Sequence, residues 1–257
     1  MKLEVNNQMV IKLSTISSGI MGKNRILTDI AKDVESILGH KNEESSRTLE
    51  IASDKDPVFL SFLARENPES YFAHFKDDNI RYPKVHPHYD EIGNLDIIYS
   101  KKALKKVAKN KKFDVVAGFF TLHELNNPRR SLEKTKPYLN DNGKLIIIDY
   151  DLGWFNQVVS EQNWDKETAK REFSKYVFNT RNEGKVLGMK DGEPWNNSDV
   201  EAECMANHTR WGPEKYALEC NAAGYEQISL KSYPIDTPWG EKPKMFLYVG
   251  RKVIKNT

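Results

Sequence analysis

Residues 112–151 read KFDVVAGFFTLHELNNPRRSLEKTKPYLNDNGKLIIIDYD, and this stretch decides the fold. Residues 113–120 and 144–149 are continuous apolar runs rich in β-branched or aromatic side chains, which predicts two strands buried on both faces. The Asn-Asn-Pro at 126–128 predicts a helix start, and residues 140–143, which end in glycine, predict its end. Leu132, Thr135 and Leu139 would form the apolar side of this helix. Strand, helix and strand form a βαβ unit, and such units build parallel sheets.

The flanking sequence continues the alternation of helices and strands. Before this stretch we predict a helix over 20–38, a strand over 47–52, a helix from Pro57 to Arg65 with Asp56 as its N-cap, strands over 71–75 and 95–99, and a helix over 101–110. After it we predict a helix over 213–223, a strand over 225–233, a loop over 234–243 and a strand over 245–250. This order is typical of an α/β protein with a doubly wound sheet.

The length of 257 residues suits one large domain, or one domain with an inserted cap. We predict an N-terminal helical lead at 1–44 and a main domain at 45–252. The pattern loosens after Asp151, where aromatic residues alternate with Gly and Asn. Residues 153–210 are therefore interpreted as a cap segment inserted into the main domain, not as a separate domain.

The charge balance argues against a general polyanion-binding protein. The 39 basic residues nearly cancel the 37 acidic ones, so a net charge of +2 predicts neither nucleic acid nor a membrane surface as a partner. The lysines of residues 101–112 alternate with apolar positions of a predicted helix, and we interpret them as a solvated helix face.

The cysteines and the N-terminal residues favour the cytoplasm. Cys204 and Cys220 are the two cysteines, which excludes a disulfide framework and favours a reducing compartment. The first residues have no apolar signal region, and no run is long enough to cross a membrane.

Several segments together resemble the class I S-adenosylmethionine-dependent methyltransferases that act on small molecules. They are FDVV at 113–116 with TLHEL at 121–125, LNDNGKLIIID at 139–149, AGY at 223–225, and FLYVGRK at 246–252. The resemblance spans residues 45–252 approximately. It implies a Rossmann-like, doubly wound, seven-stranded, mostly parallel sheet with an antiparallel C-terminal hairpin strand. It also implies S-adenosyl-L-methionine as the cofactor and a small-molecule acceptor.

The family's cofactor loop follows its first strand as acidic-x-Gly-x-Gly-x-Gly, and this chain has a degenerate version. Here the text is EIASDKD at 50–56, so the acid is Glu50 while Ala52, Asp54 and Asp56 replace the glycines. Glycine permits positive φ and close approach of a ligand to the backbone. The resemblance implies that Glu50, Ala52 and Asp54 contact the cofactor, although Glu50 could instead be satisfied by loop amides.

Further cofactor positions follow the later strands. The resemblance places a ribose-binding acid after the second strand, where Asp77 or Asp78 could serve or could be plain turn residues. Ser100 stands near the adenine position after the third strand. Phe119 and Phe120, after the fourth strand, would line the cofactor.

The chemistry of the acceptor side is carried by a few residues. His123 could act as a general base toward an acceptor hydroxyl or amine, or it could pack against the following helix. Tyr150, Asp151 and Trp154 could wall the acceptor pocket or form core packing beneath the inserted segment. No metal site is predicted, because the His86-Pro-His88 and Glu201/Cys204/His208 sets lack the paired knuckles of structural zinc.

The sequence thus predicts an enzyme that transfers a methyl group from S-adenosylmethionine to a small molecule. A different hypothesis is a non-catalytic, methyltransferase-like interaction or regulatory module, which the missing glycines motivate. A third is an enzyme of this fold that binds another ligand, such as a nucleotide derivative.

Overall fold

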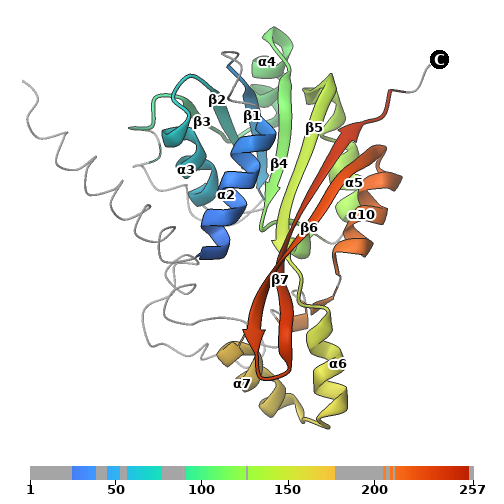
Figure 1. Ribbon diagram of the computed structural model, residues 1–257. Coiled ribbons are helices and arrows are strands. Elements are labelled where there is room, and N and C mark those ends of the chain that lie inside the picture. The colour runs from blue at the N-terminus through green and yellow to red at the C-terminus, as the bar shows by residue number, and fades with distance from the viewer. Residues whose placement is uncertain are drawn as a thin grey trace, which may run out of the picture.

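The computed structural model describes residues 25–38, 45–52, 57–76, 89, 91–125, 127–176, 205–206, 209–210 and 212–254. Seven strands form one sheet in the order β3-β2-β1-β4-β5-β7-β6 (Figure 1). They are β1 (Arg47–Ala52), β2 (Tyr71–Lys76), β3 (Leu95–Ile98), β4 (Phe113–Phe119), β5 (Leu139–Tyr150), β6 (Tyr225–Thr237) and β7 (Gly240–Lys252). Strands β1 to β5 pair in parallel, and β7 runs antiparallel to both β5 and β6. The predicted Rossmann-like sheet is therefore confirmed.

Helices cover both faces of the sheet. The α-helices are α2 (Arg25–Leu38), α3 (Val58–Glu66), α4 (Lys101–Asn110), α5 (Pro128–Glu133), α6 (Trp154–Glu161), α7 (Lys166–Tyr176) and α10 (Pro213–Ala222), and two 3-10 turns are η2 (Leu122–Glu124) and η3 (Lys136–Tyr138). One core lies between the sheet and α2 and α3, and the other lies between the sheet and α4, α5 and α10. Alternate residues of the parallel strands enter alternate cores, as the period of two requires.

The chain changes winding direction between β1 and β4. Strands β2 and β3 lie on one side of this pair, and β5, β7 and β6 lie on the other. Ligands of open α/β sheets bind at the carboxyl ends of the strands beside such a switch point. The carboxyl ends of β1, β4 and β5 are therefore placed to form a site.

The βαβ unit formed by β4, α5 and β5 differs from the prediction at its helix. α5 starts as expected, with Asn127 Oδ1 accepting from Arg130 N (2.9 Å), but it ends at Glu133 and β5 already begins at Leu139. Pro137 explains the early end, because a proline four residues after Glu133 lacks the N–H of the helical bond and its ring would clash with the Glu133 carbonyl. Residues 140–143 instead form an irregularity within β5.

The start of α3 also differs. Pro57 occupies the N-cap position, one residue later than predicted, and makes no side-chain cap bond. Asp56, the predicted N-cap, lies outside the described residues.

The predicted loop over 234–243 is wrong. β6 and β7 form one long hairpin with a turn at 238–239, and Pro234 lies opposite Pro243 across an irregular step in the pairing. Prolines are tolerated on an edge strand and at bulges, because those positions need no ladder N–H. Figure 1 shows this hairpin running beyond the rest of the sheet, with α6 and α7 beside its turn.

An aromatic cluster joins the turn of this hairpin to α6 and α7. Trp239 at the turn contacts Trp154, Phe155 and Trp164 with ring centroids 6.3, 6.5 and 5.4 Å away. Phe173 of α7 packs edge-on against Phe155 at 5.2 Å. These large rings hold the first part of the predicted inserted segment against β6 and β7. Among the described helices, none is long and apolar enough to cross a membrane.

Candidate active site

A buried histidine–aspartate pair lies where β4 and β5 end. His123, in η2 just after β4, directs Nδ1 toward Asp149 Oδ1 at 2.6 Å, and the His123 backbone N–H donates to Asp149 Oδ2 at 3.0 Å. Tyr150 N also donates to Asp149 Oδ1 (2.8 Å). Asp149 therefore binds both the ring and the backbone of His123, which fixes the position of the imidazole.

Hydrogen bonds, together with the positive charge of His123 whenever its ring is protonated, favour the ionised form of Asp149 in spite of complete burial. Burial acts to raise the pKa of Asp149, but the adjacent His123 and the two backbone N–H donors outweigh it and the pKa is lowered. An ionised Asp149 carboxylate accepts a hydrogen bond from a protonated Nδ1 of His123. The neutral His123 tautomer then carries its lone pair on Nε2, which is the form that a general base requires.

Two aromatic rings lie on one side of this pair. The Tyr150 ring lies edge-on to the His123 ring with centroids 5.4 Å apart, and the Phe120 ring lies 5.5 Å from Tyr150. Phe120 has a φ of 54°, a conformation that bulky residues rarely adopt. Its backbone N–H donates to Ile148 O (2.8 Å), so the unusual backbone is held by β5. Strained residues of this kind cluster at functional sites.

A second buried pair joins β1 and β2. Glu50 and His74 are partners in the parallel register, and His74 Nδ1 lies 2.6 Å from Glu50 Oε2. Both side chains are buried, at 4% and 0% exposure. Within the part of the chain that the structure describes, His74 Nε2 has no hydrogen-bond partner. Glu50 is thus bound by the side chain of His74, while the loop after β1, whose amides were the alternative partners, lies outside the described residues.

The other predicted cofactor residues are not part of either buried histidine–carboxylate pair. Ser100 caps α4, its Oγ accepting from Ala103 N (3.1 Å). Phe119 lies in the core, where its ring packs edge-on against Phe59 at 4.7 Å. Ala52 is the last residue of β1. Asp54, Asp77 and Asp78 lie outside the described residues.

Asp151 lies just past β5 and is nearly buried. Burial raises its pKa to about 6 against the hydrogen bond from Ser232 Oγ (3.2 Å), and the negative charge of Glu214 adds to the rise. Its backbone N–H donates to Lys244 O at 2.9 Å, which ties the end of β5 to β7. Asp151 is therefore a carboxyl group that can exchange a proton near neutral pH.

Trp154 belongs to the aromatic cluster at the hairpin turn. Its Nε1 donates to Pro243 O at 2.7 Å, and its ring lies against Phe155 and Trp239. The structure therefore brings His123 and Tyr150 together, whereas Trp154 packs toward the turn of the hairpin.

Two residues of these pairs were not singled out from the sequence. The sequence analysis gave Asp149 only as the end of a strand. The signal that could have identified it is a charged residue at the end of the apolar run LIIID. His74 stands inside a short strand, where nothing distinguishes it from a core histidine. The metal-ligand sets considered at residues 86–88 and 201–208 fall outside the described residues except at Met205 and Ala206, and the described residues hold no metal-ligand cluster.

Comparisons by sequence find no match, either to models of protein families or to curated proteins. Comparisons of structure do find matches. The chain is similar, at 12% identity and a TM-score of 0.50, to a protein of Bacillus halodurans C-125 assigned as a methyltransferase, covering 87% of this chain and 99% of that one. It is also similar to the plantazolicin methyltransferase BpumL in complex with SAH, at 10% identity and a TM-score of 0.51, covering 93% and 90%.

A third match is the CurJ carbon methyltransferase, at 12% identity and a TM-score of 0.53, covering 94% of this chain and 58% of that one. At these identities the matches establish the fold and not the activity. This chain has the fold of S-adenosylmethionine-dependent methyltransferases, in agreement with the strand order and the antiparallel β7.

Proposed function

We propose that this protein transfers a methyl group from S-adenosyl-L-methionine to a small-molecule acceptor. The observation that carries the proposal is the buried His123–Asp149 pair at the carboxyl ends of β4 and β5. It lies beside the switch point of a sheet whose strand order matches the methyltransferase fold. The BpumL structure, which holds SAH in the same fold, supports the choice of cofactor.

The residues at the end of β1 fit a ligand with polar hydrogens. Among the described residues, His74 Nδ1 contacts one oxygen of Glu50, Oε2, and the buried His74 Nε2 has no partner. A carboxylate oxygen and a ring nitrogen accept from hydroxyl or ammonium groups, both of which S-adenosylmethionine carries. The remaining proposed cofactor contacts are Ala52, Asp54, Asp77, Asp78, Ser100, Phe119 and Phe120.

Bound S-adenosylmethionine would supply an activated methyl group on a sulfonium, so the protein needs mainly to position the acceptor. His123 is the proposed general base. Asp149 holds Nδ1–H, which orients the ring and stabilises the positive charge that His123 gains when Nε2 takes the acceptor's proton. Burial of both side chains strengthens this interaction, because the local dielectric is low.

The acceptor side would be formed by Tyr150, Asp151 and Trp154. Tyr150 contacts both His123 and Phe120, so it is the best placed of the three to touch an acceptor near the base. We also keep the predicted boundaries, with a domain over 45–252 and an inserted cap over 153–210, and a cytoplasmic location as parts of this proposal.

Isothermal titration with S-adenosylmethionine and SAH tests cofactor binding. We expect saturable binding, and a loss of roughly tenfold in affinity for Glu50→Gln, because one charge-assisted hydrogen bond is worth about 1.5 kcal/mol. Asp114→Asn is the matched control. Asp114 is a carboxylate at the opposite end of the same sheet, where it accepts from Arg47 N and Asn140 Nδ2. No heat from the wild-type protein at millimolar ligand would overturn the proposal.

Methyl transfer itself needs a separate measurement. The protein is incubated with methyl-labelled cofactor and a pool of small molecules, and labelled products are identified by mass spectrometry. We expect His123→Gln to lose roughly a hundredfold in transfer while it keeps its affinity for SAH. Cofactor binding without any labelled product would instead support the non-catalytic module.

A further inference from the structure

Positive charge is concentrated in one part of this nearly neutral chain. Residues 101–112 contain seven lysines and no acidic residue, so they carry +7, and the rest of the chain carries −5 out of the net +2. Leu104 and Ala108 of α4 are buried in the core, whereas the lysines of α4 are exposed. The exposed residues of α4 are therefore its five lysines together with Ala103 and Asn110.

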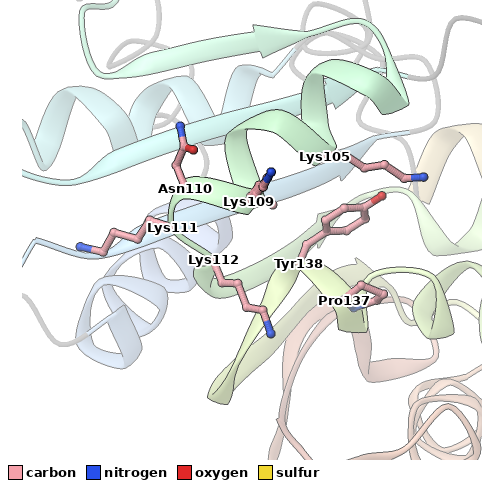
Figure 2. A pocket seen from close by; sticks show the side chains of 8 residues that line it. Lys105, Lys109, Asn110, Lys111, Lys112, Pro137 and Tyr138 are labelled. Atoms are coloured by element: carbon pink, nitrogen blue, oxygen red, sulfur yellow. The ribbon is translucent and has the colours of Figure 1, made fainter.

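Part of this charge surrounds a hollow of about 550 Å³. Lys105 and Lys109 of α4, the following Lys111 and Lys112, Asn110 and Tyr138 line it (Figure 2). A volume of this order matches the sites that bind small molecules. Four lysines, one asparagine and one tyrosine thus border a space that one small ligand can fill, and the Lys105 and Lys111 side chains point away from each other in Figure 2.

The hollow lies at the opposite end of the sheet from the candidate active site. Lys112 precedes the first residue of β4, and Tyr138 precedes the first residue of β5. His123 follows the carboxyl end of β4. A strand of seven residues separates the two ends, which is about 20 Å at 3.3 Å per residue. A ligand in the hollow therefore cannot take part in chemistry at His123.

Described residues do not neutralise the lysines of the hollow. Lys105, Lys109, Lys111 and Lys112 form no ion pair with an acidic residue of the described ranges. Asp141 is an acidic residue that interacts electrostatically with Lys112. Its carboxylate already accepts from Lys252 Nζ at 2.9 Å, and Lys252, with a smaller contribution from Lys112, lowers its pKa.

Helix stability does not account for this arrangement either. A lysine near a helix C-terminus interacts favourably with the helix dipole. This interaction explains why lysines occur at Lys109 and just after it, but not why they occur earlier in α4. Like charges four residues apart destabilise a helix. The lysines of α4 form three such pairs, 101/105, 102/106 and 105/109. A bound anion would relieve this repulsion.

We propose that the lysine-lined hollow binds a small ligand that carries two or more phosphate groups. Lysine binds phosphate as a compact point charge, and four lysines around one hollow favour a ligand with several negative charges. Tyr138 and Pro137 give the organic part of such a ligand an apolar wall. An extended polyanion would use the whole row on α4, but Lys102 and Lys106 do not line the hollow.

The test uses inorganic tripolyphosphate as the probe, with calorimetric titration of the full-length protein at low salt. Lys105→Gln/Lys109→Gln removes two charges from the hollow, and Lys102→Gln/Lys106→Gln removes two from the same helix outside it. Both pairs are four residues apart, and Gln has nearly the helix propensity of Lys, so the variants are matched. We expect the first to lose at least about tenfold in affinity and the second less than about threefold.

Three further measurements complete the design. Circular dichroism and thermal unfolding verify that both variants fold, and inorganic phosphate should bind much more weakly than tripolyphosphate. A single-stranded oligonucleotide and phosphatidylserine vesicles serve as polymeric and lipid sources of phosphate. Absence of wild-type binding, an equal loss in both variants, or tighter binding of the oligonucleotide or vesicles than of tripolyphosphate would overturn the proposal.

Discussion

Replacing Asp149 by Asn gives a sharp test of the buried pair. Asp149 accepts three hydrogen bonds, at Oδ1 from His123 Nδ1 and Tyr150 N and at Oδ2 from His123 N. Asn has one acceptor oxygen and one NH₂ group. In either orientation of the amide, the NH₂ group faces at least one N–H donor, which is left buried and unsatisfied.

The expected cost is about 3 kcal/mol, because a charge-assisted bond is lost and a donor loses its partner. For a chain of this size that corresponds to a fall of about 6 to 12 °C in Tm. Urea or thermal unfolding measures both quantities. Asp141→Asn is the control, since Asp141 is exposed and its bond to Lys252 is a surface ion pair. Removal of this surface pair should change the stability much less than the Asp149 substitution does, because solvent screens an exposed pair.

The dependence of stability on pH adds a second signature. The folded-state pKa of Asp149 is lowered, so its contribution to stability is complete above the unfolded pKa of about 4 and is lost as the pH falls through the folded value. The difference between wild type and Asp149→Asn should therefore shrink below pH about 4. Two results would refute the described pairing. One is a loss of unfolding free energy below about 1 kcal/mol in Asp149→Asn at neutral pH, and the other is a difference between the two proteins that does not change with pH.

Three further outcomes follow from other contacts. Burial raises the pKa of Asp151 to about 6, so the ionised form of this side chain destabilises the folded state. The Asp151→Asn variant should therefore gain stability relative to wild type between pH 4 and 7, by up to about 3 kcal/mol in urea titrations. Trp239→Ala should expose α6 and α7 to limited proteolysis and hydrogen exchange, whereas Trp239→Phe should retain most of their protection. Tyr225→Phe removes the 2.6 Å buried bond to Thr135 and should lower the unfolding free energy by about 1 kcal/mol, with a loss near zero contradicting that bond.

The sheet was predictable because its signals are local. Each buried strand is a short apolar run, and the turn residues around it end the run within a few positions. The errors have local causes as well. Pro137 was not weighed against the helix expected over 128–139, and the prolines of 234–243 were interpreted as a loop although an edge hairpin accommodates them.

The site was predictable only in part. His123 and Glu50 were singled out because the sequence places them after or near the end of a predicted strand, and their roles in a site stay predictions. Their partners were not singled out, because Asp149 and His74 lie 26 and 24 residues away along the chain. Only the strand register brings such residues within hydrogen-bond distance.

The sequence by itself determined the class of the fold, the order of its elements and the edge of the sheet at which polar residues gather. These features depend on periodicity and turn chemistry, which act over a few residues. Tertiary structure alone decided that His123 faces Asp149, that His74 takes one oxygen of Glu50, and that the lysines of α4 meet Tyr138 around a hollow. The physical reason is that pairing between distant strands and packing of helices on them set side-chain distances and burial, and no local pattern specifies either.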